Sequence, residues 1–368
     1  MSGRMLRALG LMSGTSLDGI DIALVETDGE DRVRRGPSAT LPYPPEFRAK
    51  LRLALSDAGS IVDRRERPGR LADVERELTE RHTEAVLRFI GNLALQPSAV
   101  DVVGFHGQTV LHRPEQRLTV QIGDGALLAA RTGIDVVHDL RANDCAHGGQ
   151  GAPLVPVYHR ALAATVPERP LGVLNIGGVA NVTWIGPDGD LVAFDTGPGN
   201  ALMDDWALRH TGHPVDRDGA LAAAGVPDAG VLARALAHPY FHRPAPKSLD
   251  RNDFTVAMAD GLAVEAGAAT LAEFTVRSIA AAVDHMPMKP AAWIVTGGGR
   301  RNVWLMKRLA DVLGTPLSTA EAHGWDGDSM EAEAWAYLAV RSLAGLPITF
   351  PGTTGAPRPL TGGVVAKA

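Results

Sequence analysis

Three apolar runs open the chain, and polar or glycine-rich turns separate them. Residues 6–12 are mostly apolar, residues 13–19 have the sequence Ser-Gly-Thr-Ser-Leu-Asp-Gly, and residues 20–25 are apolar again. An Asp-Gly pair at 28–29 marks a tight turn before a third stretch at 32–41. This pattern predicts three consecutive strands that form a β-meander.

The same plan returns in the middle of the chain. Residues 171–176 and 181–185 are apolar runs joined by a turn that contains Gly177 and Gly178, and a Pro-Asp-Gly turn leads to a third run at 191–194. Self-similarity at about half the chain length favours two related units. Chance similarity between two glycine-rich hairpins is the alternative.

Helical periodicity and further apolar runs follow each meander. Helices are predicted at residues 71–95, 200–210, 262–283, 303–313 and 329–343, and strands at 100–105, 134–137 and 293–296. Strands that alternate with helices after a meander are typical of α/β proteins with mixed sheets. We predict an N-terminal lobe of residues 1–136 plus about 345–368 and a C-terminal lobe of residues 137–344.

Composition excludes several classes of protein. The 36 basic against 42 acidic side chains give a net charge of −6, so no basic excess exists to bind nucleic acid. The single cysteine, Cys145, cannot form an intrachain disulfide or a cysteine-based zinc site. Because the chain has neither a secretory signal nor an apolar stretch of about 18 residues, we expect a cytoplasmic protein without a membrane partner.

The first glycine-containing turn has the composition of a phosphate-binding loop. Gly14 and Gly19 allow the backbone to approach a ligand closely, and Thr15 and Ser16 can donate to phosphate oxygens. Asp18 can hold a magnesium ion, directly or through water. An ordinary polar hairpin is an equally good interpretation. The turn lacks the Gly-Lys-Ser/Thr ending of a Walker A loop and the Gly-x-Ser-x-Gly pattern of serine hydrolases.

Asp195 follows an apolar strand and precedes a glycine turn. Ligands bind where strands end in α/β sheets, and a carboxylate there can accept a proton from an attacking hydroxyl or water. The alternative is a turn former or a helix N-terminal carboxylate. Three glycines at 297–299 end another buried strand, where a flat ring such as adenine can lie against the backbone; a tight strand-to-helix turn is the alternative.

Further polar groups follow the strand at 100–105. His106 and Gln108 can hydrogen-bond sugar hydroxyls, although a satisfied buried histidine is more common. Arg141 can bind a substrate carboxylate in bidentate fashion, or it can pair with Asp144. A zinc site at residues 144–147 is not supported, because the spacing matches no common metal signature.

Two late segments complete the candidates. Glu331 starts the last predicted helix one turn before Trp335, which places it toward the packed face; it either complements the helix dipole or faces a cleft. Residues 225–253 are rich in proline and histidine. This stretch is a flexible or dimer-facing insertion, and no role is assigned to it.

Six segments, taken in order, make the chain resemble the anhydro-N-acetylmuramic acid kinase family. They are residues 10–21, 105–109, 144–156, 174–178, 194–200 and 297–299. The resemblance implies the two-lobed α/β fold of actin, hexokinase and Hsp70-like ATPases. In that fold each lobe has a mixed sheet with a β-meander flanked by helices, and nucleotide and sugar bind in the cleft between the lobes.

The resemblance also implies an activity. Such a kinase opens the 1,6-anhydro bond of 1,6-anhydro-N-acetylmuramic acid with water and phosphorylates O6 with ATP, which gives N-acetylmuramic acid 6-phosphate and ADP in cell-wall amino-sugar recycling. It implies ATP and Mg²⁺ as cofactors and a homodimer. The alternatives are another sugar kinase of the superfamily acting on a free hydroxyl, and a nucleotide-dependent binding module without turnover.

The resemblance assigns residues to these tasks. Asp195 is the base that takes a proton from the attacking water, and Glu331 helps to orient that water. The residues expected to bind ATP are Gly14, Thr15, Ser16, Leu17, Asp18, Gly19, Ile20, Asp21, Gly177, Gly178, Gly297, Gly298 and Gly299. The residues expected to bind the sugar are His106, Gln108, Thr109 and Arg141, and the lactyl carboxylate of the substrate suits the cation of Arg141.

Overall fold

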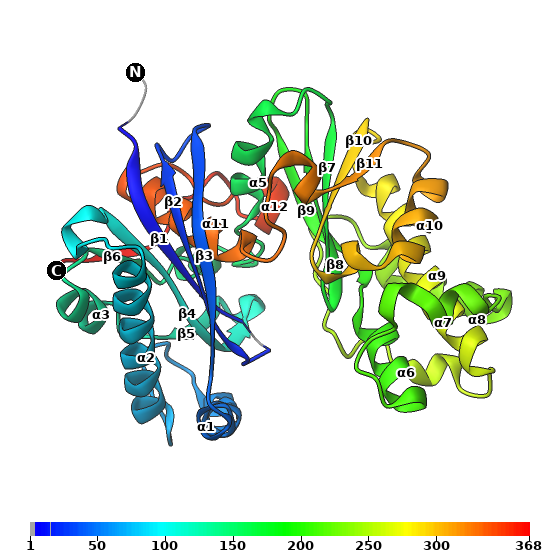
Figure 1. Cartoon of the computed structure of the whole chain (residues 1–368), viewed down its shortest axis with the longest axis horizontal. Helices are drawn as coiled ribbons and strands as arrows, with labels where there is room; N and C mark the ends of the chain where they lie inside the picture. Colours follow the sequence, from blue (N-terminus) through cyan, green and yellow to red (C-terminus); the bar gives the residue numbers. More distant parts are fainter. Residues whose placement is uncertain (1–3, 15) are drawn as a thin grey trace. The chain divides into compact units, whose positions relative to one another are not determined.

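The computed structural model describes residues 4–14 and 16–368, and the chain divides into two compact units (Figure 1). One consists of Met1–Thr165 and Ser329–Ala368, and the other of Val166–Asp328. Each unit is described by itself below.

A seven-stranded mixed sheet forms the first unit. Its strand order is β12 (Val364–Ala366), β6 (Val136–His138), β4 (Val102–Arg113), β1 (Leu6–Ser13), β2 (Gly19–Thr27) and β3 (Val33–Pro42), with β5 (Leu118–Ile122) paired to β4. Strands β1, β2 and β3 are antiparallel, as the meander prediction requires, whereas β4 lies parallel to both β1 and β6. The carboxyl ends of β1, β4 and β6 therefore meet at one edge, where ligand sites form in such sheets.

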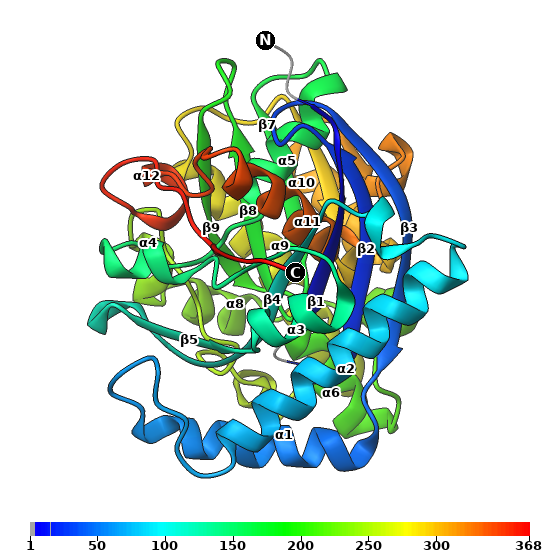
Figure 2. The same ribbon diagram turned by 90° about the vertical axis from the view of Figure 1, so that its left-hand side faces the viewer.

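Helices cover both faces of this sheet. They are α1 (Pro45–Asp57), α2 (Leu71–Asn92), α3 (Gly125–Thr132), α4 (Ala142–Ala146), α5 (Pro156–Leu162), α11 (Met330–Leu343) and α12 (Pro351–Thr354). Figure 2 shows α2 crossing in front of β2 and β3, with α1 beyond the lower ends of these strands. Leu9 and Leu11 of β1 share a core with Leu71 and Leu78 of α2, whereas α11 packs on the opposite face.

The boundaries between the units differ from those expected from the sequence, which lay near residues 136 and 345. The structure moves the first to Thr165/Val166 and the second to Asp328/Ser329. The physical reason is that β6 pairs with β4 and that α11 packs on β1, β4 and β2, so both segments belong to the first sheet.

Two glycines allow α11 to lie directly on the first sheet. A Cβ at Gly10 of β1 would stand 1.8 Å from the carbonyl oxygen of Ala332, and one at Gly104 of β4 would stand 2.0 Å from that of Trp335. No side chain larger than hydrogen fits at either position without moving the helix. From Ala332 to Arg341 every residue of α11 is buried.

The second unit is built around a five-stranded sheet. Its strand order is β11 (Leu317–Thr319), β10 (Ala292–Thr296), β7 (Leu171–Ile176), β8 (Val179–Ile185) and β9 (Leu191–Pro198). Its helices are α6 (Ala201–Thr211), α7 (Ala220–Ala224), α8 (Ala229–Leu236), α9 (Val264–Ala282) and α10 (Val303–Leu313). Trp206, Phe274 and Trp293 are fully buried in its core.

The two sheets share one topology. In each, the first strand of an antiparallel meander (β1 or β7) has the second and third strands on one side and two parallel strands on the other: β4 and β6 in the first sheet, β10 and β11 in the second. Both predicted meanders and the α/β class with mixed sheets are therefore confirmed. Strand β5 was not predicted, and β4 was predicted to end at residue 105 rather than at Arg113, because polar residues continue the strand beyond the buried run.

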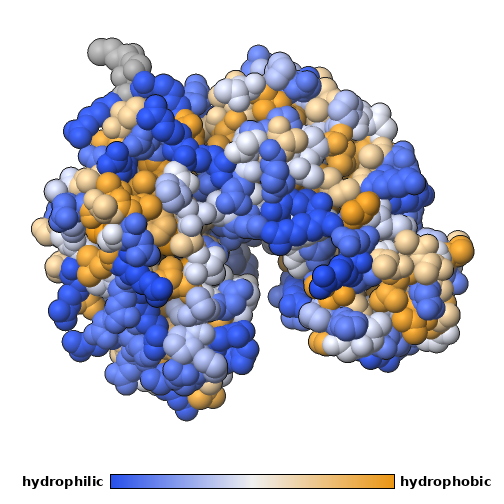
Figure 3. Space-filling model, viewed as in Figure 1, coloured by the Kyte–Doolittle hydropathy of each residue, from blue (hydrophilic) through white to orange (hydrophobic). Residues whose placement is uncertain are grey.

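Apolar surface gathers over α7 and α8 of the second unit (Figure 3). Val226, between these helices, has an exposed fraction of 79%, and Leu232 and Leu236 of α8 line a hollow together with Trp304 of α10. Among the described residues no single helix is long and apolar enough to cross a membrane. One bent pair, residues 217–224 and 229–236, has the necessary combined length and composition.

The contact between Gly104 and α11 predicts a large loss of stability on Gly104→Ala. The added methyl group would overlap the Trp335 carbonyl, so the sheet or the helix must move. We expect the free energy of unfolding to fall by about 3 kcal/mol, measured by urea denaturation.

Gly91→Ala is the matched control. Gly91 lies in the last turn of α2 with open space around its Cβ position, so alanine should be neutral or stabilise by up to about 1 kcal/mol. A Gly104→Ala protein as stable as the parent would show that α11 does not lie this close to β4.

Candidate functional site

A buried glutamine of β4 holds the turn between β1 and β2. Ser13, the last residue of β1, donates its hydroxyl to Gln108 Oε1 at 2.7 Å, and Gln108 Nε2 donates to the Gly14 carbonyl at 3.2 Å. Thr109, half-buried, accepts a hydrogen bond from Gln121 at 3.2 Å. Because Gln108 is fully buried and both ends of its amide are used, it shapes the backbone of the turn. The sugar contacts expected for Gln108 and Thr109 stay predictions.

The turn itself is tightly folded. Leu17 has a φ of +57°, in the left-handed region, and its amide donates to the Gly14 carbonyl at 3.2 Å. Its side chain is buried in the core of the first unit, which anchors the turn. Asp18 is exposed and accepts the Ser16 hydroxyl at 2.7 Å. Thr15, also expected to bind ATP, lies outside the described residues.

The two glycines that flank this turn differ in the space around them. A Cβ at Gly19 would stand 2.4 Å from the Leu41 carbonyl oxygen, so close pairing with β3 requires this glycine. At Gly14 the nearest atom would be 3.5 Å away, an ordinary van der Waals contact, so a Cβ is not excluded there. Ile20 is buried in the core, whereas Asp21 is half-buried at the start of β2. These residues were predicted to bind ATP, and the structure brings them together at one end of the sheet.

His106 and Arg141 form a polar pair against the indole ring of Trp335. Arg141 Nε donates to His106 Nε2 at 3.2 Å, and Arg141 Nη1 donates to the Gly151 carbonyl at 2.8 Å. The guanidinium carbon lies 5.1 Å from the Trp335 ring centroid, and the His106 ring lies 4.5 Å from it. The predicted alternative, an ion pair with Asp144, is not formed among the described residues.

Burial governs the charge of both groups. Burial, reinforced by the adjacent guanidinium, holds the pKa of His106 well below its usual range, so the ring is neutral. Because Nε2 accepts from Arg141, the ring proton belongs on Nδ1, which has no partner among the described residues. Burial lowers the pKa of Arg141 to about 10, so its positive charge persists at neutral pH. The pair thus presents a fixed cation.

Glu331 lies in the first turn of α11, and its side chain is exposed. The expectation that it faces the packed side with Trp335 is wrong, because α11 becomes buried all round only from Ala332 onward. Desolvation by the surrounding protein raises the pKa of the Glu331 carboxyl. The positive charge of Arg141 opposes that rise, and the negative charge of Asp21 adds to it. Glu331 therefore belongs to the same end of the first sheet as Arg141.

Glu333, two residues further on, is the buried carboxylate that the sequence analysis missed. Arg35 of β3 donates to both of its oxygens at 2.9 Å, and Tyr158 of α5 and Ser329 donate at 2.7 Å and 2.9 Å. Tyr158 precedes the first boundary between the units, and Ser329 follows the second. Through the Glu333 carboxylate, Tyr158 near the end of the unit's first segment and Ser329 at the start of its second segment are linked to Arg35 of β3. The sequence does contain one indication of this role, because Glu333 is a charged residue in a largely apolar helix.

Asp195 lies within β9 of the second unit, three residues before the strand ends, rather than after it as predicted. It pairs with Asn181 of β8, and its Oδ2 accepts the backbone N–H of Leu249 at 2.8 Å. Burial raises the pKa of the Asp195 carboxyl to about 6, and this hydrogen bond opposes the rise. A carboxylate of this kind is a stronger base than one in water.

Residues 225–253 supply the surroundings of Asp195. Tyr240 donates its hydroxyl to the Asp195 carbonyl at 2.5 Å, and Asp195 N–H donates to the Lys247 carbonyl at 3.0 Å. The sequence analysis gave this stretch no role, because nothing local to it indicates that it runs along β9.

The turn between β7 and β8 is held by the segment after β9. The amides of Gly199 and Asn200 donate to the carbonyls of Gly178 and Gly177 at 2.9 Å and 2.7 Å, and Asn200 Nδ2 donates to the Ile176 carbonyl at 3.0 Å. A Cβ at Gly199 would stand 2.2 Å from the Gly177 oxygen, so this contact requires glycine. The turn is therefore preformed.

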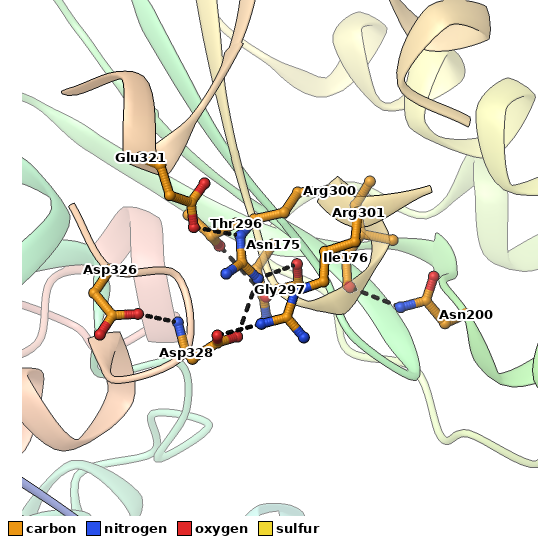
Figure 4. A network of polar contacts seen from close by, with 10 residues as sticks. All are labelled: Asn175, Ile176, Asn200, Thr296, Gly297, Arg300, Arg301, Glu321, Asp326 and Asp328. Carbon is orange, nitrogen blue, oxygen red and sulfur yellow. Dashed lines mark hydrogen bonds and ion pairs between the residues drawn. The ribbon is translucent and has the colours of Figure 1, made fainter. Parts of the chain in front are cut away.

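The glycines after β10 join the same network (Figure 4). Gly297 has a φ of +72°, and a Cβ there would stand 2.3 Å from Asn175 Oδ1. A Cβ at Gly299 would stand 2.4 Å from the Ile176 side chain, whereas at Gly298 the nearest atom is 3.3 Å away. The structure thus brings the two glycine turns predicted to bind ATP, 177–178 and 297–299, close together.

Arg300 fixes the second of these turns. Its guanidinium donates to the Gly297 carbonyl at 2.8 Å, to Glu321 at 2.7 Å and to Asp328 at 3.1 Å, and the ion pairs with these two carboxylates raise its pKa against the effect of burial (Figure 4). Arg301 also pairs with Asp328. Arg300 is another residue that the sequence analysis missed.

Among residues 4–14 and 16–368 no group of three or more His, Cys, Asp or Glu side chains could hold a metal ion. Asp144, in the segment where a zinc site was considered, instead accepts hydrogen bonds from the Gly151 amide at 2.6 Å and from the Thr354 hydroxyl at 2.7 Å. A magnesium ion needs few protein ligands when it binds through nucleotide phosphates. The exposed carboxylate of Asp18, beside the turn that ends β1, fits such an ion.

Comparison with known proteins adds independent findings. A family profile described as anhydro-N-acetylmuramic acid kinase matches residues 6–368. The chain is 54% identical to the anhydro-N-acetylmuramic acid kinase of Methylobacterium nodulans, over 98% of this chain and 100% of that protein. It is 56% identical to the one from Rhodospirillum rubrum, over 97% and 93%.

Similarity to solved structures is weaker. A ROK family glucokinase from Streptomyces griseus, solved with glucose and AMPPNP, matches with a TM-score of 0.42 and 13% identity, over 90% of this chain and 98% of that one.

The contacts of Glu333 predict a large effect of Glu333→Gln. The variant leaves the mostly buried Arg35 guanidinium without its carboxylate, which is costly inside a protein. We expect the free energy of unfolding to fall by about 3 kcal/mol in urea denaturation.

Glu80→Gln is the control, because Glu80 forms an exposed pair with Arg76 at 3.5 Å and should contribute less than about 0.5 kcal/mol. Equal stability of the two variants would contradict the anchoring role of Glu333.

Proposed function

Because this chain belongs to the anhydro-N-acetylmuramic acid kinase family, we propose that it opens the 1,6-anhydro ring of 1,6-anhydro-N-acetylmuramic acid with water and transfers the γ-phosphate of ATP to O6. The products are N-acetylmuramic acid 6-phosphate and ADP. The family membership confirms the resemblance drawn from the sequence motifs. The relatives do not favour the two alternatives, a kinase for free hydroxyls and a binding module without turnover.

One observation carries the mechanistic part of the proposal: the partly desolvated carboxylate of Asp195 on β9. In the proposed reaction Asp195 accepts a proton from the attacking water. The water oxygen forms a bond to C1, the bond between C1 and O6 breaks, and O6 takes the γ-phosphoryl group as ADP leaves. A pKa of about 6 keeps Asp195 ionised at neutral pH and still basic enough to receive the proton.

Two groups of the first unit also act on the sugar substrate in this proposal. Arg141 binds the lactyl carboxylate. Its Nε and Nη1 are engaged with His106 and Gly151, and no partner is found for its Nη2 among the described residues. Glu331, exposed at the start of α11, orients the water. Support for placing the two together is electrostatic, since each shifts the pKa of the other.

The glycine turns bind ATP in this proposal. Backbone N–H groups of tight turns hold phosphate oxygens well, because they are fixed before the ligand arrives. The turns at Gly14, at Gly177–Gly178 and at Gly297–Gly299 are each held by hydrogen bonds or close contacts. Mg²⁺, when bound beside Asp18, would neutralise phosphate charge in the transition state.

We also propose a homodimer in the cytoplasm, where ATP is available. The exposed apolar area over α7 and α8, which includes Val226, supports an interface between copies (Figure 3). Measuring the molar mass of the protein in solution tests the homodimer, and cell fractionation tests the cytoplasmic location.

The proposed reaction makes a prediction about the origin of the C1 hydroxyl. In water enriched with oxygen-18, the product should carry the label at C1, because that oxygen comes from solvent.

Asp195→Asn should lower kcat by about a thousandfold or more and leave ATP binding unchanged, since it removes only the base. Mass spectrometry of the product and calorimetric ATP titration measure the two effects.

Asp204→Asn serves as the control. Asp204 is also a carboxyl of the second unit whose pKa burial raises to about 6, but no role is assigned to it, so kcat should stay within about twofold. An unlabelled C1 would instead favour a kinase acting on a free hydroxyl. Full turnover by Asp195→Asn would rule out the assigned base.

Another prediction tests whether Arg141 recognises the lactyl group of the substrate rather than its sugar ring. Arg141→Ala should raise KM for the anhydromuramic sugar by about a hundredfold, because a charge-assisted hydrogen bond is lost. With 1,6-anhydro-N-acetylglucosamine, which lacks the carboxylate, the same variant should change kcat/KM much less. Arg209→Ala, at an exposed ion pair with Asp260, is the control. Equal losses on both sugars would argue against carboxylate binding.

A further inference from the structure

Residues 240–249 lie along Asp195 and contact it at three points. The Tyr240 hydroxyl donates to the Asp195 carbonyl at 2.5 Å, the Lys247 carbonyl accepts the Asp195 N–H at 3.0 Å, and the Leu249 N–H donates to Asp195 Oδ2 at 2.8 Å. The first two contacts fix the main chain of Asp195 on both sides of its Cα. The third fixes the side chain.

The third contact makes the two carboxylate oxygens unequal. Oδ2 already accepts a backbone N–H, whereas Oδ1 has no donor among the described residues. A backbone amide cannot swing away as a long side chain can, so the orientation of the carboxylate is set before substrate binds. Oδ1 keeps its lone pairs available for a proton.

The segment is itself anchored to the core of the second unit. Tyr240 and Phe241 are buried, and Phe241 packs against Phe274 of α9 with ring centroids 5.8 Å apart. His285 Nε2 donates to the Phe241 carbonyl at 2.6 Å. The Lys247 ammonium donates to the carbonyls of Tyr240 and Phe241 at 3.2 Å and 3.3 Å. These contacts hold the segment in place beside β9.

The charges around this support leave Asp195 without a cation partner. The ionisable groups within the segment are Tyr240, His242, Arg243 and Lys247, and those beside it include Asp250, Asp253 and His285. Lys247 is directed to backbone carbonyls, and burial lowers its pKa to about 8. No ion pair with Asp195 is formed within the described part of the chain. The Leu249 N–H is thus the hydrogen bond that stabilises the charged form of this carboxylate.

We propose that residues 240–249 act as a clamp that gives the two oxygens of Asp195 separate tasks: Oδ2 holds the Leu249 N–H, and Oδ1 receives the proton. Tyr240 and Leu249 are then positioning residues. This inference rests on the proposed role of Asp195 as the base. As the water oxygen bonds to C1, its O–H bond breaks and the proton passes to Oδ1, while the hydrogen bond to Oδ2 persists.

Leu249→Pro tests the clamp, because proline has no N–H. The lost hydrogen bond had favoured the charged carboxylate, so the pKa of Asp195 should rise. In the parent protein kcat should fall as pH decreases through about 6, where Asp195 takes up a proton. In Leu249→Pro this acidic limb should move to higher pH by about one unit. The measurement is kcat against pH at saturating ATP and anhydro sugar.

Leu249→Ala is the matched variant, because it removes the side chain but keeps the N–H. Its acidic limb should stay at the pH of the parent. A folded Leu249→Pro protein whose limb does not move would overturn the clamp, as would a shift of the same size in Leu249→Ala.

Tyr240→Phe gives a second test if Leu249→Pro fails to fold, which circular dichroism would show. Losing one hydrogen bond to the main chain of Asp195 should lower kcat about fivefold and leave KM for both substrates unchanged. An unchanged kcat, or a rise in KM alone, would overturn the positioning role of Tyr240.

A readout without turnover keeps this test separate from that of the proposed function. The carboxyl carbon-13 resonance of Asp195, assigned by its loss in Asp195→Asn, reports the titration directly. The midpoint should lie near 6 in the parent and higher in Leu249→Pro. A protein that shows this shift but no ATP-dependent phosphorylation of the anhydro sugar would contradict the function and retain the clamp. A protein that phosphorylates the anhydro sugar but shows no shift would retain the function and contradict the clamp.

Discussion

Taking a carboxylate out of water without placing a cation beside it is the constraint on which the proposed chemistry depends. Two other buried carboxylates have cation partners: Arg35 neutralises Glu333, and Arg277 and Arg308 neutralise Glu273. At Asp195 a backbone N–H is the one hydrogen-bond partner found for the carboxylate among the described residues. The charged form therefore stays costly, and that cost makes the group a base near neutral pH.

The repeated sheet topology explains where the chemical groups lie. In each unit the first strand of the meander runs parallel to a neighbouring strand, so polar residues that end or follow these two strands meet at one edge. In the first unit this edge carries the turn at Gly14 and the pair of His106 and Arg141. In the second it carries the turns at Gly177 and Gly297. Hydrogen bonds from more distant segments, such as Arg300 to the Gly297 carbonyl, make these turns rigid.

Much of this architecture was predictable, because it follows from neighbours along the chain. Alternating apolar runs separated by Asp-Gly and Gly-Gly turns specify meanders locally, and β7 and α10 begin and end where predicted. The glycine turns and Asp195 were recognised from short motifs. Boundaries that depend on pairing with distant strands, such as the extension of β9 to Pro198, were not.

The amino-acid order alone was enough to establish the two meanders, the α/β class, the family resemblance and the candidate base. It could not distinguish Glu331 from Glu333, because a helix buried on nearly all sides has no periodic polar face. Nor could it show that Gln108 serves the Gly14 turn, or that residues 240–249 hold Asp195. These roles arise from contacts between residues about 45 to 95 positions apart in the chain, which exist only once the sheets have formed.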